Sequence, residues 1–180
     1  EVTGEYSEHY KGLHPPYSRE APTYFKKDGR HYLITSGTSG YCPNPSQVCV
    51  FDDFHGEYTD LGDPCINDTD KTSFFSQFTC VLKVPNKDLY IAMADRWKPT
   101  AFGKWFTKKY YGMIEKAMSG NRHSDITKPD ESPKENTELA GKKLGHFVNT
   151  SIADYVWLPI EFIDGKPTIK WYDEWKIENF

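Results

Sequence analysis

The sequence predicts an all-β fold built from two four-stranded antiparallel sheets. Aromatic residues make up 16% of the 180 residues, with 12 Tyr and 11 Phe, and such rings suit half-buried strands better than helical bundles. Asp-Gly pairs, which favour tight hairpin turns, separate strand-like runs at Asp28-Gly29 and Asp164-Gly165. Four short strands occur twice along the chain, and the first set falls within about forty residues, the size of one propeller blade. The sequence therefore predicts two stacked blades.

The first predicted blade covers residues 18–63. The runs "TYFKK" and "HYLITSG" flank the Asp28-Gly29 turn and predict one hairpin. The runs "QVCVFDD" and "EYTDLG", separated by "FHG", predict a second hairpin. Residues 1–17 are polar and contain Gly and Pro, which is typical of an irregular lead-in.

The second predicted blade combines residues 74–99 with residues 154–176. The runs "FTCVLKV" and "LYIAMADRW" flank a turn around Pro85 and predict a hairpin. Much later, "YVWLPIEFI" and "TIKWYDEW" flank the Asp164-Gly165 turn and predict the last two strands. The inner runs of both sets are apolar, which favours packing of one sheet on the other.

Residues 100–153 form a predicted insertion within the second blade. The stretch Thr100 to Gly120 has apolar residues at helical spacing and ends at a glycine, so it predicts a helix. The following stretch, "NRHSDITKPDESPKENTELAGKK", is charged and nearly free of large apolar side chains. It predicts a mobile, solvated loop.

Length and charge narrow the function classes. A chain of 180 residues is long enough for one domain with a sizeable core. The net charge of −4 provides no basic field for nucleic acid. No run of about eighteen apolar residues is present, so no membrane span is predicted. The first residues, "EVTGEYSEHYKG", lack the basic and apolar regions of a signal peptide. A mature or truncated chain would lack these regions too.

The cysteines leave two alternatives open. Their spacings match no zinc pattern and no His pair accompanies them, so no metal site is predicted. Either one or two disulfides form outside the cell, or the thiols are free and buried. Glycosylation triplets at Asn67 and Asn149 favour secretion and thus an extracellular or cell-envelope location. The four cysteines are Cys42, Cys49, Cys65 and Cys80.

Four segments in order carry a resemblance to a known family. They are "REAPTYFKKDGRHYLITSG", "FFSQFTCVLKV", "IAMADRWKP" and "YVWLPIEF…IKWYDEW". Together they resemble the C-terminal part of glycoside hydrolase family 43 enzymes, and most closely the branch of exo-acting β-1,3-galactanases and related β-galactosidases. The resemblance implies a five-bladed β-propeller with an axial active site, of which residues 1–180 are the C-terminal portion. The partners it implies are an oligo- or polysaccharide and the remaining N-terminal blades, on the same domain or a partner chain.

The resemblance assigns catalytic roles to Glu20 and Gln77. Glu20 occupies the place of the glutamate in E-[AG]-P, the general acid of the family, and Pro22 would stiffen the start of that strand. A general acid must be protonated near neutral pH, which requires a desolvated pocket or a nearby negative charge. Gln77 is similar to a glutamine that faces the attacking water where the usual base is vacant; it would orient that water or accept a proton through a tautomer. Without the resemblance, Glu20 is an ordinary surface carboxylate and Gln77 a strand-end amide.

Further positions are candidates for substrate binding. Thr38 in "SGTSG" resembles a threonine that contacts the sugar in this branch. Arg96 in "ADRW" would bind substrate hydroxyls or hold Glu20 by charge, or else form a structural ion pair with Asp95 or another acid. Aromatic side chains would stack on sugar or pack in the core, and the candidates are Trp97, Tyr155 and Trp157.

The predicted strand positions also give a geometry. Glu20 and Gln77 each lie at the start of the first strand of successive blades, where inner strands run side by side. We therefore expect their carboxyl and amide groups to share one pocket at a separation of ~5–10 Å. Arg96 and Thr38 would lie on the wall of that pocket.

The expected function is an inverting, exo-acting glycoside hydrolase on galactose-containing plant polysaccharide such as β-1,3-galactan. Xylosidases and arabinofuranosidases share the fold and stay as alternatives, as does a non-catalytic carbohydrate-binding propeller. No cofactor is required for this chemistry, and the resemblance leaves room for a structural calcium ion.

Overall fold

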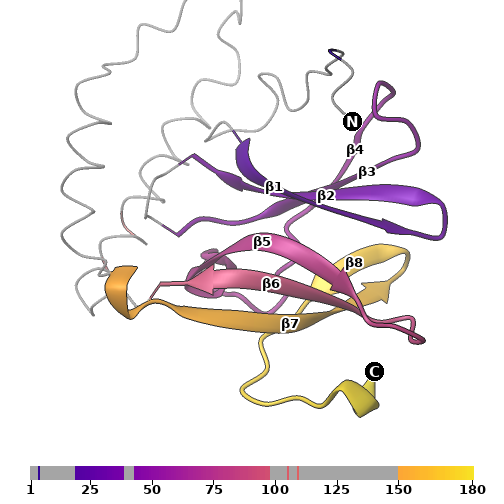
Figure 1. The fold of residues 1–180 in the computed structure, drawn as a ribbon. Helices are drawn as coiled ribbons and strands as arrows, with labels where there is room; N and C mark the ends of the chain where they lie inside the picture. The colour runs from indigo at the N-terminus through magenta and orange to yellow at the C-terminus, as the bar shows by residue number, and fades with distance from the viewer. Residues whose placement is uncertain (1–3, 5–18, 39–42, 98–104, 106–108, 110–149) are drawn as a thin grey trace, which may run out of the picture.

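The structure is a computed structural model, and it describes residue 4, residues 19–38 and 43–97, residues 105 and 109, and residues 150–180. Within these residues the strands form two four-stranded antiparallel sheets with the orders β1-β2-β3-β4 and β5-β6-β7-β8. Figure 1 shows the two sheets stacked one above the other. The prediction of an all-β fold with about two blades is confirmed.

The first sheet is a simple meander. The turn between β1 and β2 has positive φ angles at both central residues, 51° at Asp28 and 83° at Gly29, as a tight hairpin turn requires. Both predicted hairpins are present in this sheet. Its strands are β1 (Arg19–Lys27), β2 (Arg30–Gly37), β3 (Gln47–Phe51) and β4 (Thr59–Gly62).

The second sheet repeats the meander across the predicted insertion. Its Asp164-Gly165 turn also has positive φ at both residues, 51° and 75°. The predicted last strand was too long: β8 ends at Ile169, and the backbone N–H of Trp171 donates to Oδ1 of Asn67 at 2.9 Å instead of to a neighbouring strand. The strands are β5 (Ser76–Lys83), β6 (Tyr90–Arg96), β7 (Asp154–Ile163) and β8 (Lys166–Ile169).

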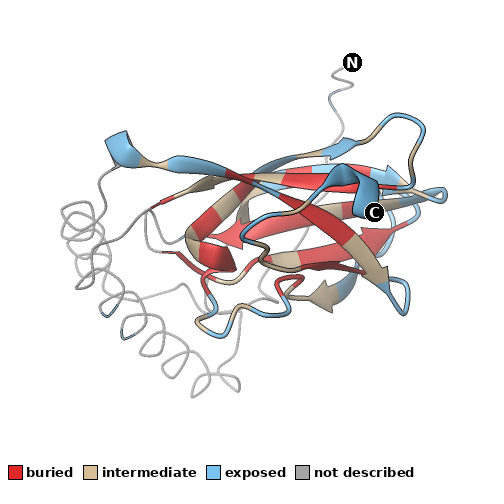
Figure 2. Cartoon of the chain, turned by 90° about the horizontal axis from the view of Figure 1, so that it is seen from below, coloured by how far each residue is buried: buried red, intermediate tan, exposed pale blue. Residues whose placement is uncertain are grey.

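The core lies between the two sheets. The ring of Phe25 in β1 packs 5.5 Å from the ring of Tyr90 in β6 and 6.4 Å from that of Phe162 in β7. The Tyr90 hydroxyl donates to the carbonyl of Lys26 at 2.9 Å, so its polar end is also satisfied. Burying each such ring contributes about 1.5–3 kcal/mol. Buried residues therefore occupy the middle of the strands, whereas the turns are exposed (Figure 2).

Two connecting segments are fastened to the second sheet. Cys65 forms a parallel bridge with Ile169 of β8, flanked by a hydrogen bond of 2.7 Å from Ile169 N–H to the Pro64 carbonyl. The C-terminal segment, which contains the 3-10 helix η3 (Ile177–Asn179), runs below β7 on the side away from the first sheet (Figure 1). The indole N–H of Trp175 donates to the Trp157 carbonyl at 2.8 Å and holds that segment in place.

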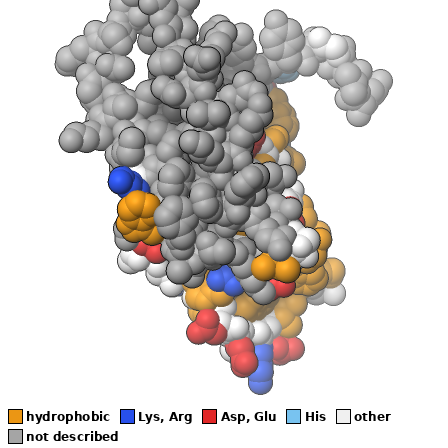
Figure 3. Space-filling view, turned by 90° about the vertical axis from the view of Figure 1, so that its left-hand side faces the viewer, with side chains coloured by type: hydrophobic (Ala, Val, Ile, Leu, Met, Phe, Trp, Pro, Cys, Tyr) orange, Lys and Arg blue, Asp and Glu red, His pale blue; other side chains and the backbone are white. Residues whose placement is uncertain are grey.

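Large apolar side chains are exposed on the outer faces of both sheets. Tyr24 and Phe54 of the first sheet region are 44% and 49% exposed, and Leu82 in β5 is 50% exposed. Figure 3 shows hydrophobic side chains of described residues at the surface beside charged ones. Exposed rings on the outer face of a sheet are typical of a surface that packs against another element.

Several predictions fall on residues that are only partly described. Trp105 and Lys109 both have helical backbone, and the Lys109 ammonium lies 4.9 Å from the centroid of the Trp105 ring, as expected one helical turn apart. The rest of the predicted helix and loop lies outside the described residues. In the described part of the chain, no helix is long and apolar enough to cross a membrane. Cys65 and Cys80 are free thiols, Cys49 is a buried cysteine, and Cys42 lies outside the described residues.

Candidate active site

Glu20 is the second residue of β1, directly before a bulge. The pairing of β1 with β2 joins Glu20 to Ser36 and then shifts register before Thr23. Ala21, inside the irregular stretch, has a φ of 49° although it is not glycine. Such backbone strain costs about 1–3 kcal/mol and is often found at functional sites. The bulge thus sets the direction of the strand start that carries Glu20.

Gln77 is the second residue of β5, and its amide reaches the first sheet. Its Nε2 donates to the Ser36 hydroxyl at 2.8 Å and to Oε1 of Glu20 at 3.4 Å. Glu20 and Gln77 therefore do converge, as predicted from their strand positions. The expected separation of ~5–10 Å was wrong, because the Ser36 hydroxyl holds the amide against β2 and beside the carboxylate.

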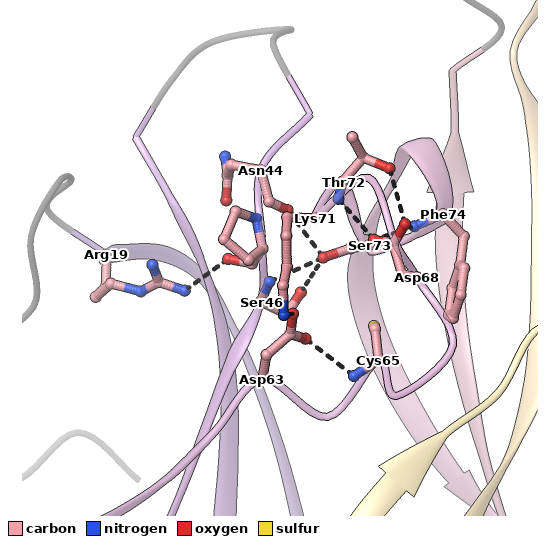
Figure 4. Close-up of polar contacts among 11 residues, drawn as sticks. Arg19, Asn44, Ser46, Asp63, Cys65, Asp68, Lys71, Thr72, Ser73 and Phe74 are labelled. Atoms are coloured by element: carbon pink, nitrogen blue, oxygen red, sulfur yellow. Dashed lines mark hydrogen bonds and ion pairs between the residues drawn. The ribbon is translucent and has the colours of Figure 1, made fainter. Parts of the chain in front are cut away.

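A left-handed turn stands immediately before β5. Ser73, Phe74 and Phe75, which form η1 (Ser73–Phe75), have φ angles of 52°, 61° and 59°. Left-handed backbone at a residue other than glycine costs about 1–2 kcal/mol per residue, so the turn needs strong anchors. One anchor is Asp68, whose Oδ2 accepts from the backbone N–H of Thr72 at 2.6 Å and of Phe74 at 3.3 Å (Figure 4).

A buried hydrogen-bond network joins this turn to the end of β2. The Asn44 side chain binds Gly37 twice, accepting from its N–H at 2.8 Å and donating to its carbonyl at 2.9 Å. The Ser73 hydroxyl in turn donates to the Asn44 carbonyl at 2.9 Å and accepts from the Ser46 N–H at 2.9 Å (Figure 4). Gly37, Asn44 and the turn that precedes Gln77 are therefore held in one unit.

Two titratable groups, the half-buried Asp63 and the buried Cys65, lie beside the network. Oδ1 of Asp63 accepts from the Cys65 N–H at 2.9 Å, and its Oδ2 is buried 3.8 Å from the Lys71 ammonium. Burial raises the pKa of the Asp63 carboxyl, an effect that the hydrogen bond from the Cys65 N–H and the charge of Lys71 oppose only in part. Burial also raises the pKa of the Cys65 thiol well above its ordinary value, so this cysteine is a protonated, unreactive thiol at neutral pH.

Thr38 and Arg96 lie in different surroundings. Thr38 is exposed and directly follows Gly37, the residue that Asn44 clamps. Arg96 donates from Nε to the Phe74 carbonyl at 3.3 Å, and its guanidinium lies 4.4 Å from the Trp171 ring centroid. Among the described residues Arg96 forms an ion pair neither with Glu20 nor with Asp95, so its observed contacts support the left-handed turn.

The aromatic candidates divide into buried and exposed rings. Trp97 is 9% exposed and is therefore a core residue, and its backbone N–H donates to the Phe75 carbonyl of the turn at 2.9 Å. Tyr155 is 79% exposed and Trp157 52% exposed. Tyr155 pairs with Asp95, which pairs with Gln77, so these three residues share one face of the second sheet.

Sequence reasoning identified the two converging side chains but missed the residues that hold them. Ser36, Asn44 and Ser73 are each no more than 6% exposed and carry the contacts described above. Serine and asparagine are common in loops and strands, and no spacing rule distinguishes them. A metal site is not apparent either: within the described ranges, no group of three or more His, Cys, Asp or Glu residues could hold an ion.

Comparison with known proteins identifies similar folds. No family model matches the sequence, and no match was found among curated proteins. The GH43 β-1,3-galactosidase BT3683, solved with galactodeoxynojirimycin, is 29% identical over 88% of this chain and 32% of its own, with a TM-score of 0.56. The GH43 β-1,3-galactosidase BT0265 is 26% identical over 90% of this chain and 24% of its own, with a TM-score of 0.57. A protein of Bifidobacterium bifidum s17, at 18% identity and a TM-score of 0.50, shares the fold alone.

These matches cover nearly all of this chain but only part of each similar protein. The chain spans 32% of the length of BT3683 and 24% of that of BT0265. Its two four-stranded sheets correspond to about two blades of those enzymes. The resemblance to glycoside hydrolase family 43 is thus confirmed, and the chain has the glycosidase fold of one part of a GH43 β-1,3-galactosidase.

Proposed function

We propose that the protein is an inverting, exo-acting glycoside hydrolase that removes galactose from a β-1,3-linked galactan. The observation that carries the proposal is the meeting of Glu20 and Gln77 across two sheets, with 3.4 Å between Oε1 and Nε2. An acid and an amide at the same ends of neighbouring first strands are the pair that the family resemblance assigns to catalysis. The similarity to two β-1,3-galactosidases supports galactose as the sugar.

In the proposed reaction, Glu20 donates its proton to the glycosidic oxygen while the bond from that oxygen to the anomeric carbon breaks. A water attacks the same carbon from the opposite face, and its oxygen forms the new bond. The proton that this water loses passes to the Gln77 amide oxygen or to solvent. The product then carries the inverted configuration at the anomeric carbon.

The orientation of the amide is compatible with this role. Gln77 presents its nitrogen to Glu20, and the oxygen of a planar amide points away from its nitrogen. A water bound at that oxygen is therefore separated from the carboxyl by at least the width of the amide. Inverting enzymes hold their two catalytic groups about 6.5–9.5 Å apart to accommodate sugar and water. Glu20 Oε1 lies 3.4 Å from Gln77 Nε2 in the structure, so in this proposal the Glu20 carboxyl rotates away from the amide when substrate binds.

Additional sheets complete the site in this proposal. The outer faces of both sheets expose large rings, among them Tyr24 and Trp157, and further blades of the same domain or of a partner chain would cover them. Those blades would contribute the acid that tunes Glu20 and much of the sugar pocket. A polysaccharide substrate also fits the proposed extracellular or cell-envelope location.

Incubation with defined polysaccharides tests the proposal. The protein is assayed with β-1,3-galactan, xylan and arabinan, and the released sugars are identified together with their anomeric configuration. Release of α-galactose from the β-linked galactan supports the proposal. Release of only xylose or arabinose would assign the protein to another activity of the family, whereas galactan binding without turnover would identify a carbohydrate-binding propeller.

A further inference from the structure

The side-chain amide of Gln77 has two ends with opposite hydrogen-bonding properties. Its nitrogen only donates and its oxygen only accepts. An amide that orients an attacking water must therefore be held with one defined end toward the water. In the structure the nitrogen points to the first sheet, where it donates to Ser36 Oγ at 2.8 Å and to Glu20 Oε1 at 3.4 Å.

The Ser36 contact is the shorter of the two and comes from a fixed residue. Ser36 is 5% exposed and lies in β2, paired with Glu20. The next residue, Gly37, is bound at both backbone groups by Asn44, and Asn44 is bound by Ser73, four residues before Gln77. Hydrogen bonds and the backbone therefore connect Ser36 through Asn44 and Ser73 to Gln77. The hydrogen bond from Gln77 to Ser36 closes this ring.

Glu20 holds the amide less strongly when it is protonated than when it is ionised. An ionised carboxylate accepts hydrogen bonds only, but a general acid must carry a proton before it acts. In that protonated state the Glu20 hydroxyl points to the leaving oxygen, and its hold on the amide weakens. The Ser36 hydroxyl remains as the acceptor that keeps the Gln77 nitrogen turned toward β2.

We propose that Ser36 is a positioning residue that fixes the orientation of the Gln77 amide and so leaves its oxygen for the attacking water. This inference rests on the proposed hydrolase function. Ser36 acts through Gln77 and touches no reacting atom in this scheme. Its loss should therefore affect the turnover step more than the binding of sugar.

The structure offers a matched control for this test. The Thr23 hydroxyl, in β1 and 1% exposed, donates to the Phe78 carbonyl at 3.1 Å. Like Ser36, Thr23 connects the first sheet to the start of β5 through one buried hydroxyl, but its partner is the backbone of the residue after Gln77. Thr23→Val and Ser36→Ala therefore remove comparable inter-sheet hydrogen bonds, and only the second frees the amide.

Kinetics on β-1,3-galactan compare the two variants. We expect Ser36→Ala to lower kcat about tenfold or more with little change in KM, because a misplaced catalytic group costs rate. Thr23→Val should lower thermal stability by a similar amount but keep kcat within about twofold of wild type. Ser36→Thr, which keeps the hydroxyl, should restore most of the rate. Equal loss of kcat in Ser36→Ala and Thr23→Val, or an unchanged kcat in Ser36→Ala, would overturn the proposal.

A second measurement separates this proposal from the hydrolase assignment. The side-chain ¹⁵N–¹H resonances of Gln77 are assigned by their disappearance in Gln77→Ala and then followed in the uncomplexed protein. We expect them to shift in Ser36→Ala and to stay in place in Thr23→Val. If wild-type protein hydrolyses no galactan but the shift is seen, the proposed function fails and the positioning contact stands. Unchanged Gln77 resonances in Ser36→Ala would overturn the contact itself, whatever the activity.

Discussion

The starts of β1 and β5 hold equivalent positions but are built differently. Glu20 and Gln77 are each the second residue of the first strand of a four-stranded sheet, and a register shift follows each of them. The start of β5 is preceded by a left-handed turn within a buried hydrogen-bond network. At the start of β1, Arg19 donates to the Thr35 carbonyl at 2.7 Å, and the hydrogen bond of the Glu20 carboxylate with described residues comes from Gln77.

This difference suggests that Gln77 is held more firmly than Glu20 in the proposed site. The anchored turn fixes the backbone that precedes Gln77, and Ser36 binds its side-chain amide. Glu20 is half-buried and keeps more freedom to rotate its carboxyl. A group that orients water benefits from a fixed position, whereas an acid has to follow the oxygen of a departing sugar. The following variants test whether the two strand starts differ in this way.

The largest effect is expected at the flexible start. Glu20→Gln keeps the shape of the side chain but removes the transferable proton, so galactan hydrolysis should fall by about 10²–10⁴-fold. Binding of galactodeoxynojirimycin, the ligand solved with BT3683, should persist in calorimetry. Hydrolysis at the wild-type rate would show that Glu20 is not the general acid.

A smaller loss is expected when the fixed group is removed. Gln77→Ala deletes the amide that orients water while leaving the acid in place, and kcat should fall by about 10²-fold. The matched variant Thr79→Ala changes an exposed side chain two residues along the same strand and should leave kcat near the wild-type value. A similar kcat in both variants would remove Gln77 from the mechanism.

Much of the fold was predictable because local signals agreed with the final structure. The Asp28-Gly29 and Asp164-Gly165 pairs fix their hairpins through residues that tolerate positive φ. The last strand was predicted too long, since the aromatic run after Ile169 has high β-propensity although its backbone bonds elsewhere. Propensity describes the residue, and the available partners decide whether a strand continues.

The candidate site was predictable only in its two principal residues. Glu20 and Gln77 stand in recognisable segments, and strand order places them together. Their direct contact depends on Ser36, and the geometry of Gln77 depends on Ser73, whose φ of 52° is not encoded by a glycine. A left-handed serine stabilised by long-range partners has no local signature in the sequence.

The third variant examines the anchored turn itself. Ser73→Ala leaves the Asn44 carbonyl and the Ser46 N–H without their hydroxyl partner. A buried polar group that loses its hydrogen-bond partner lowers the free energy of unfolding by about 1–3 kcal/mol. Ser73→Gly loses the same bonds but relieves the positive φ, so it should be less destabilising by about 1 kcal/mol. Urea unfolding measures both. Equal stability of the two variants would mean that the turn stores no backbone strain at this residue.

The smallest expected effect concerns Asp63, which lies beside the same network. Burial raises the pKa of its carboxyl above the ordinary value of 3.8 in the folded protein. Between 3.8 and the folded pKa, the folded protein keeps a proton that the unfolded chain has lost, so the free energy of unfolding falls as the pH rises through this window. Above the folded pKa the destabilisation is complete and constant.

Asp63→Asn should remove this pH dependence. The amide oxygen can still accept from the Cys65 N–H, which Asp63 Oδ1 binds at 2.9 Å, and no buried charge forms on either side of the window. In urea unfolding from pH 4 to pH 7, the free energy of unfolding of the variant should rise relative to that of wild type as the pH rises. The relative increase should be less than about 1 kcal/mol at pH 7. A difference between the two proteins that is constant with pH would place the charge of Asp63 in well-compensated surroundings, with Lys71 at 3.8 Å as the compensating partner. In that case the rigid start of β5 would have an ionic anchor as well as the hydrogen bonds described above.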